Sequence, residues 1–60
     1  MITVEQCRKA ALEDQEIFKA KIEELKEDLL VDPSNQKLRR HLAKYRKELF
    51  RVQEYLKILG

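Results

Sequence analysis

Helix-breaking residues occur at only one internal place in this chain. Residues 3–31 and 34–59 contain neither glycine nor proline, and the turn-forming residues cluster at 31–35. A chain with one such interruption can fold back on itself once. We therefore predict a single domain of 60 residues, with a helix over about 3–31, a turn at about 31–35 and a second helix over about 35–59.

The residues of the turn indicate where the two helices end and begin. Pro33 disfavours helical geometry in the residue before it, so the first helix should end near Val31. Ser34 or Asn35 can cap the second helix with a side-chain oxygen. Asp32 is a competing cap, with the proline as the first helical residue.

The first helix has a complete start signal. Thr3 followed by Gln6 fits a capping box, in which each side chain binds a backbone N–H at the other position. Ile2 and Cys7 occupy the two positions of a hydrophobic staple. The sequence therefore predicts that the helix begins directly after Thr3.

The apolar residues of both predicted helices follow a heptad pattern, and we call them the seam. The first helix has a seam that Arg8 and Gln15 interrupt: Val4, Ala11, Phe18, Ile22, Leu25 and Leu29. The second helix has a seam whose spacings alternate between four and three: Leu38, Leu42, Tyr45, Leu49, Val52, Leu56 and Leu59. This pattern predicts an all-α fold, an antiparallel two-helix hairpin of the coiled-coil type.

Folding the chain back at Pro33 pairs residues whose numbers add up to about 67. Every layer of the seam agrees with this single register. The register predicts these neighbours: Leu29 and Leu38, Leu25 and Leu42, Ile22 and Tyr45, Phe18 and Leu49, Arg8 and Leu59.

Several large apolar residues lie off the seam and remain for a second contact. Scattered apolar residues on a surface are ordinary, but a chain of this size usually needs a partner for stability. We predict that the hairpin assembles into a four-helix bundle with a second copy, or docks on the helices of a larger protein. The candidate contact residues are Leu12, Ile17, Phe50, Tyr55 and Ile58.

Charge is divided unevenly between the two halves. Residues 1–32 carry a net charge of −4 and residues 33–60 carry +6. Opposite signs on adjacent helices favour closure of the hairpin, and Arg39 and Arg46, which flank the seam, can reach acidic groups on the first helix.

A row of basic residues follows the second helix on the side away from its seam. This basic stripe comprises Lys37, Arg40, Lys44, Lys47 and Arg51. One interpretation is a solvated face. The other is a surface that follows the phosphates of RNA or another nucleic acid, or an acidic protein.

The chain lacks the residues that catalysis and metal binding require. His41 and Cys7 are the only histidine and cysteine, and the register keeps them far apart. Gly60 is the only glycine, so no phosphate-binding glycine loop can form. We expect no enzyme activity, no metal, no cofactor and no small-molecule substrate. The acidic run from Glu23 to Asp28 is expected to be a solvated face. The alternative is a regulator that uses this run to block a site on another macromolecule by charge mimicry.

The chain contains no apolar run of transmembrane length and no signal-peptide pattern at its start. A single cysteine fits a reducing compartment, so we expect a cytoplasmic protein that does not bind membranes. The expected function is that of a structural or adaptor protein that acts through helix–helix contacts and associates with itself. Nucleic-acid binding along the basic stripe is the alternative.

The layout resembles that of short two-helix proteins, a class that includes plasmid copy-control RNA-binding dimers and small type III secretion chaperones. Length and the seam carry this resemblance. Residues 38–59, LRRHLAKYRKELFRVQEYLKIL, are also similar in their mixture of arginine and leucine to the basic helices of two ribosomal protein families. Neither resemblance assigns a role to any residue.

Overall fold

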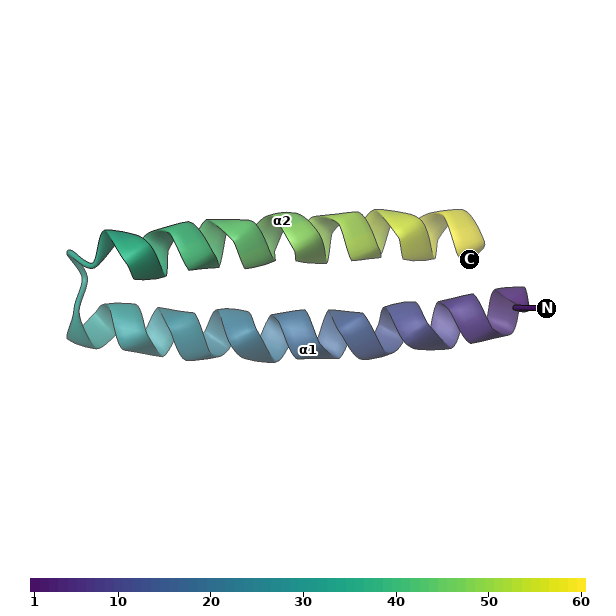
Figure 1. Cartoon of the computed structure of the whole chain (residues 1–60), viewed down its shortest axis with the longest axis horizontal. Coiled ribbons are helices and arrows are strands. Elements are labelled where there is room, and N and C mark those ends of the chain that lie inside the picture. The colour runs from purple at the N-terminus through teal and green to yellow at the C-terminus, as the bar shows by residue number, and fades with distance from the viewer.

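The computed structural model describes all 60 residues, and most of them form two antiparallel α-helices. Helix α1 spans Val4–Val31 and helix α2 spans Gln36–Leu59. Figure 1 shows them side by side along their whole length, with both chain termini at one end and the turn at the other. The predicted all-α helical hairpin is confirmed.

The start of α1 has the predicted capping box. The Thr3 hydroxyl accepts a hydrogen bond from the Gln6 backbone N–H at 3.1 Å, and the Gln6 side chain accepts one from the Thr3 backbone N–H at 3.0 Å. Two of the unpaired N–H groups at the helix start are thereby satisfied. Glu5 adds a negative charge to the first turn, where the helix dipole favours it.

The structure selects Asn35 among the three candidate caps of α2. Its side-chain oxygen accepts a hydrogen bond from the Leu38 backbone N–H at 3.2 Å. Asp32 instead closes the turn: its carboxylate accepts from the Asn35 side-chain amide at 3.1 Å, and its carbonyl accepts from the Asn35 backbone N–H at 3.2 Å. The two residues therefore fix each other across Pro33 and Ser34.

The seam forms the only apolar interior of the hairpin. Ala11, Ile22 and Leu25 are buried, and all seven seam residues of α2 are half-buried. One long-range hydrogen bond agrees with the predicted register. The Arg8 guanidinium donates to the Leu59 carbonyl at 2.9 Å, far from the turn. The ring centroids of Phe18 and Tyr45 lie 6.0 Å apart. The register predicts Leu49 opposite Phe18 and Ile22 opposite Tyr45, so the two rings belong to adjacent layers of the seam.

The seam of α1 differs from the prediction at its first turn. Val4 is 58% exposed, whereas Cys7 is half-buried. The register leaves Val4 without an opposite residue, because α2 ends at Leu59. The last layer of the hairpin is therefore built around Cys7.

No ion pair connects the two helices, so Arg39 and Arg46 form no salt bridge with the acidic groups of α1. All five salt bridges join residues three apart within one helix. Arg46 lines a small groove together with Lys19, Glu23 and Lys26 of α1, where acidic and basic side chains alternate. These two lysines bind glutamates of their own helix, at 3.9 and 3.2 Å.

The hairpin is long and thin. It measures 45 × 17 × 14 Å, and its radius of gyration is 14.0 Å. A globular domain of this length has a radius of gyration of about 10.4 Å. Neither α1 nor α2 combines the length and the apolar composition that a membrane-spanning helix needs.

Candidate interaction surfaces

The hairpin exposes more surface than a folded chain of its mass usually does. Its accessible surface is 5039 Å². A compact monomer of 7.2 kDa exposes about 4,100 Å², so the excess is about 900 Å². Only three residues are buried, because two helices side by side cover one stripe of each and leave the other sides in water.

Helical periodicity places many exposed side chains on two opposite faces of the hairpin, while others, such as Glu27 and Lys47, lie on the outer sides of the helices. The first is the Tyr55 face, on which both helices contribute a row with alternating spacings of three and four. Its α1 row contains Cys7, Ala10, Asp14, Ile17, Lys21, Glu24 and Asp28. Its α2 row contains Lys37, His41, Lys44, Glu48, Arg51, Tyr55 and Ile58.

The second is the Phe50 face, on the other side of the seam. Its α1 row contains Glu5, Lys9, Leu12, Glu16, Lys19, Glu23, Lys26 and Leu30. Its α2 row contains Arg39, Ala43, Arg46, Phe50, Gln53 and Lys57. The five predicted contact residues are all exposed, but they do not form one patch. Ile17, Tyr55 and Ile58 belong to the Tyr55 face, and Leu12 and Phe50 belong to the Phe50 face.

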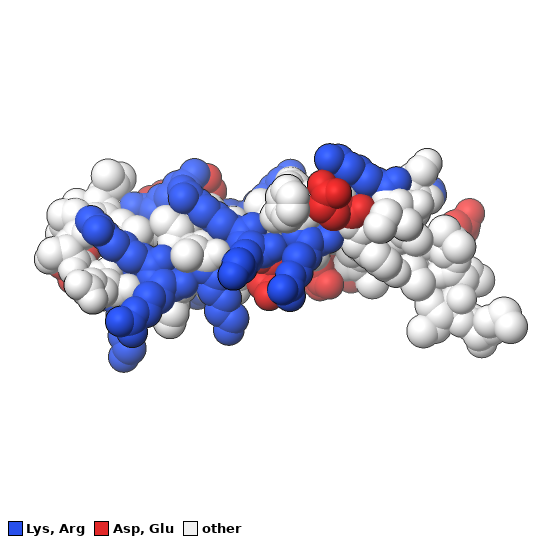
Figure 2. Space-filling view, turned by 90° about the horizontal axis from the view of Figure 1, so that it is seen from above, with Lys and Arg blue, Asp and Glu red and all other residues white.

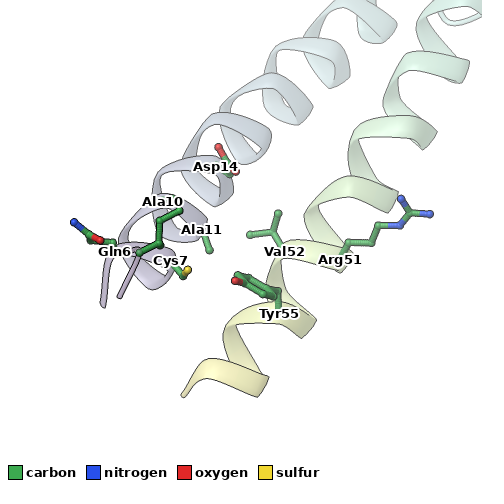
Figure 3. Close-up of a pocket in the computed structure, with 9 residues that line it drawn as sticks. Gln6, Cys7, Ala10, Ala11, Asp14, Arg51, Val52 and Tyr55 are labelled. Carbon is green, nitrogen blue, oxygen red and sulfur yellow. The ribbon is translucent and has the colours of Figure 1, made fainter. Parts of the chain in front are cut away.

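A shallow groove of about 610 Å³ opens on the Tyr55 face at the end that holds the termini. Cys7, Ala10 and Ala11 line its α1 side, and Val52 and Tyr55 line its α2 side. Figure 3 shows the Tyr55 ring reaching across toward Cys7. The groove exists because α1 contributes only small side chains in this layer.

Polar residues stand at the rim of this groove. Gln6 and Asp14 come from α1, and Arg51 comes from α2. In Figure 3 the Arg51 side chain extends away from the groove. Arg51 lies 3.8 Å from Glu48 on its own helix, and Asp14 has no ion-pair partner. An apolar floor with a charged rim is the usual composition of a protein contact site.

Cys7 influences the acidity of Tyr55 across the groove. A side-chain hydrogen bond with Cys7 is the main reason that the pKa of Tyr55 lies above its ordinary value of 10.0. The electrostatic effect of Cys7 and some desolvation of the phenol raise this pKa further. Loss of the Tyr55 phenol proton is therefore disfavoured beside Cys7.

The basic residues of α2 have few counter-charges. In the basic stripe, only Arg51 forms an ion pair, and Lys37, Arg40, Lys44 and Lys47 form none. Figure 2, a view onto the α2 side, shows Lys and Arg covering the part near the turn and uncharged residues covering the end near the termini. Arg39 and Arg46 are also unpaired, which makes six unpaired basic side chains on α2.

Sequence reasoning missed two features of these surfaces. One is the extent of the basic surface, because Arg39 and Arg46, which can reach acidic groups of α1, form no ion pair with them. The other is the groove, whose signal in the sequence is the run of small residues at Cys7, Ala10 and Ala11 opposite Val52. No cluster of three or more histidine, cysteine, aspartate or glutamate residues is placed to hold a metal ion.

Comparison with protein families, with curated proteins and with solved structures finds no match for this chain. Its function therefore has to be inferred from its own surfaces.

Proposed function

We propose that this chain is a non-catalytic helix-packing module that associates with a second copy of itself through the exposed sides of its helices. The observation that carries this proposal is the excess of exposed surface. About 900 Å² beyond that of a compact monomer is close to the roughly 800 Å² that each partner contributes to a stable interface.

The kind of side chain exposed supports the same proposal. Ile17, Phe50 and Ile58 are each at least 62% exposed, although burying a side chain of this size contributes about 1.5–3 kcal/mol. A helix that is apolar on more than its seam is typical of four-helix bundles, in which each helix packs against two neighbours.

The test is light scattering coupled to size exclusion at two protein concentrations and two salt concentrations. We expect a helical dimer whose mass does not fall at high salt, because exposed apolar side chains are buried in its contact. A folded monomer at micromolar to millimolar concentration would contradict the proposal of self-association. In that case the exposed apolar side chains would belong to an interface with a different protein.

A second candidate function, nucleic-acid binding by α2, is favoured by the six unpaired basic side chains. They extend over the first three turns and the middle of α2, on two of its sides. Phosphate contacts release counterions, so the logarithm of the affinity should fall linearly with the logarithm of the salt concentration.

The double variant Lys44→Gln/Lys47→Gln tests this second function with labelled duplex oligonucleotides. Log affinity falls with log salt, and each lost phosphate contact should make this slope shallower by about 0.9. The two substitutions together should make it shallower by about 1.8. The matched control is Lys19→Gln/Lys26→Gln, which removes two lysines that already bind glutamates on α1. An equal change in both variants would mean that α2 is not the binding surface.

A further inference from the structure

The two faces of the hairpin differ in their charge, and the difference points to one mode of assembly. On the Tyr55 face, the α1 row has a net charge of −2, from three acidic residues and Lys21. The α2 row has a net charge of +2, from three basic residues and Glu48. On the Phe50 face, the α1 row is neutral and the α2 row carries +3, from Arg39, Arg46 and Lys57.

A second copy meets repulsion on one face and none on the other. Two Phe50 faces brought together would place a charge of +6 in one interface. Two Tyr55 faces together are neutral, and each contains an acidic row and a basic row of equal size. Charge therefore favours the Tyr55 face for contact between identical chains.

Only one symmetric arrangement brings the acidic row onto the basic row. A two-fold axis parallel to the length of the hairpin places α1 of each copy on α2 of the other, with both turns at the same end. A two-fold axis across the hairpin places α2 on α2, which puts two rows of charge +2 together. Like charges in contact are unfavourable by up to several kcal/mol, so the first arrangement is selected.

We propose that a second copy of this chain docks on the Tyr55 face with its turn at the same end, so that α1 of each copy packs on α2 of the other. This inference rests on the proposed self-association and specifies its face, direction and register.

The register of this contact follows from that of the hairpin. The two-fold axis keeps each α1 residue at the same height along the hairpin in both copies. Each α1 residue therefore faces the partner's α2 residue for which the two residue numbers add up to about 67. Within two residues of this sum, or about 3 Å along the axis, every charged residue of the α1 row has an opposite charge on the partner, although Lys21 is equally close in level to the partner's Lys44. The pairs are Asp14 with the partner's Arg51, Lys21 with the partner's Glu48, Glu24 with the partner's Lys44, and Asp28 with the partner's Lys37.

The apolar residues of the face other than Ile17, which lies among the charged levels, meet at the end that holds the termini. Ala10 and Cys7 come to the level of the partner's Tyr55 and Ile58, so large side chains of each copy face the small ones that line the partner's groove. Tyr55 is 43% exposed and Ile58 is 82% exposed in the single hairpin. The face measures at most about 45 × 17 Å, or roughly 770 Å², which suffices for a standard interface.

The pair of Glu24 and Lys44 distinguishes contacts between copies from contacts within one hairpin. Both residues project outward from the seam, and they form no ion pair with each other in the structure. Glu24→Lys and Lys44→Glu should each weaken the dimer about 10-fold, because each replaces two attractive contacts by two repulsive ones. The double variant Glu24→Lys/Lys44→Glu should restore most of the affinity.

Two controls carry the same changes of charge outside the contact. Glu27 and Lys47 lie on the outermost sides of their helices, away from both the seam and the Tyr55 face. Glu27→Lys and Lys47→Glu should therefore leave the dissociation constant within about 2-fold of the parent. Sedimentation gives the dissociation constants, and circular dichroism shows that each variant keeps its helices.

The direction of the two copies is measured by a distance between spin labels. Ser34 is exposed in the turn, so the variant Cys7→Ser/Ser34→Cys carries one label on each chain at that place. We expect the two labels to lie within about 25 Å, since adjacent helices are separated by about 10 Å. With the turns at opposite ends, the labels would lie about 45 Å apart, the length of the hairpin.

The outcomes separate this inference from the proposed function. A short label distance together with rescue by the double variant supports the arrangement. A dimer with a long distance, or one in which Lys47→Glu weakens association as much as Lys44→Glu, overturns the arrangement and leaves self-association standing. A monomer at every concentration overturns both. Association that depends on bound nucleic acid, detected by ultraviolet absorbance, overturns the inference in favour of binding along the basic stripe.

Discussion

Replacing Leu25 by alanine tests the seam at its most buried position. The Leu25 side chain is 4% exposed, and Leu30, on the same helix, is 84% exposed. Leucine-to-alanine changes at buried sites cost about 2–5 kcal/mol, depending on how far the neighbours collapse into the space. The opposite seam residue, Leu42, is only half-buried and can move inward, so we expect about 2.5 kcal/mol for Leu25→Ala.

The matched control, Leu30→Ala, makes the same chemical change in water and should cost less than about 0.5 kcal/mol. A domain of this size has a total stability of about 3–9 kcal/mol, so the difference between the variants is a large part of it. Urea unfolding followed by circular dichroism measures both values. All samples need one protein concentration, because the stability of a dimer depends on it.

Equal destabilisation by Leu25→Ala and Leu30→Ala would refute the reasoning. It would mean that Leu30 is as well buried in the assembled protein as Leu25. Since Leu30 belongs to the Phe50 face, that result would also contradict docking through the Tyr55 face.

Three other predictions concern single contacts. Asn35→Ala should lower the free energy of unfolding by about 1 kcal/mol through loss of the α2 cap, whereas Ser34→Ala should have less effect; urea unfolding compares them. Cys7→Ala should shift the pKa of Tyr55 down toward 10.0, because the hydrogen bond that holds the phenol protonated is lost; a spectrophotometric pH titration that shows no shift would contradict this. Arg8→Met should increase fraying of the last turn of α2, seen as faster amide hydrogen exchange there with little change elsewhere, since Arg8 donates to a carbonyl of that turn.

Aromatic residues on the two faces give a further comparison. Tyr55→Ala should weaken self-association much more than Phe50→Ala, because only Tyr55 lies in the proposed contact. From sequence alone, Phe50 and Tyr55 are both candidate contact residues. Sedimentation of the Tyr55 and Phe50 variants decides between the two faces, and a larger effect at Phe50 would favour the Phe50 face.

Much of the fold could be predicted from the sequence because the relevant interactions are local. The capping box at Thr3 and Gln6, the end of α1 near Pro33 and the heptad spacing of the seam each depend on residues at most four apart. The register also followed, since the short turn at Pro33 leaves one way to align the two seams. The hydrogen bond from Arg8 to Leu59 agrees with it at the far end.

Other features were decided only by the tertiary structure. Spacing along one helix gives an angle around that helix, but the pairing of two antiparallel helices decides which flank of α1 lies beside which flank of α2. This is why Arg46 lies beside Lys19 and Lys26 as well as Glu23, and why the contact candidates separate into a Tyr55 face and a Phe50 face. Likewise, Ser34, Asn35 and Asp32 can each cap a helix, and the closure of the turn decided that Asn35 caps α2. The sequence by itself determined the helices and the seam, because their causes are periodic and local; the surfaces depend on how two such helices are placed together in space.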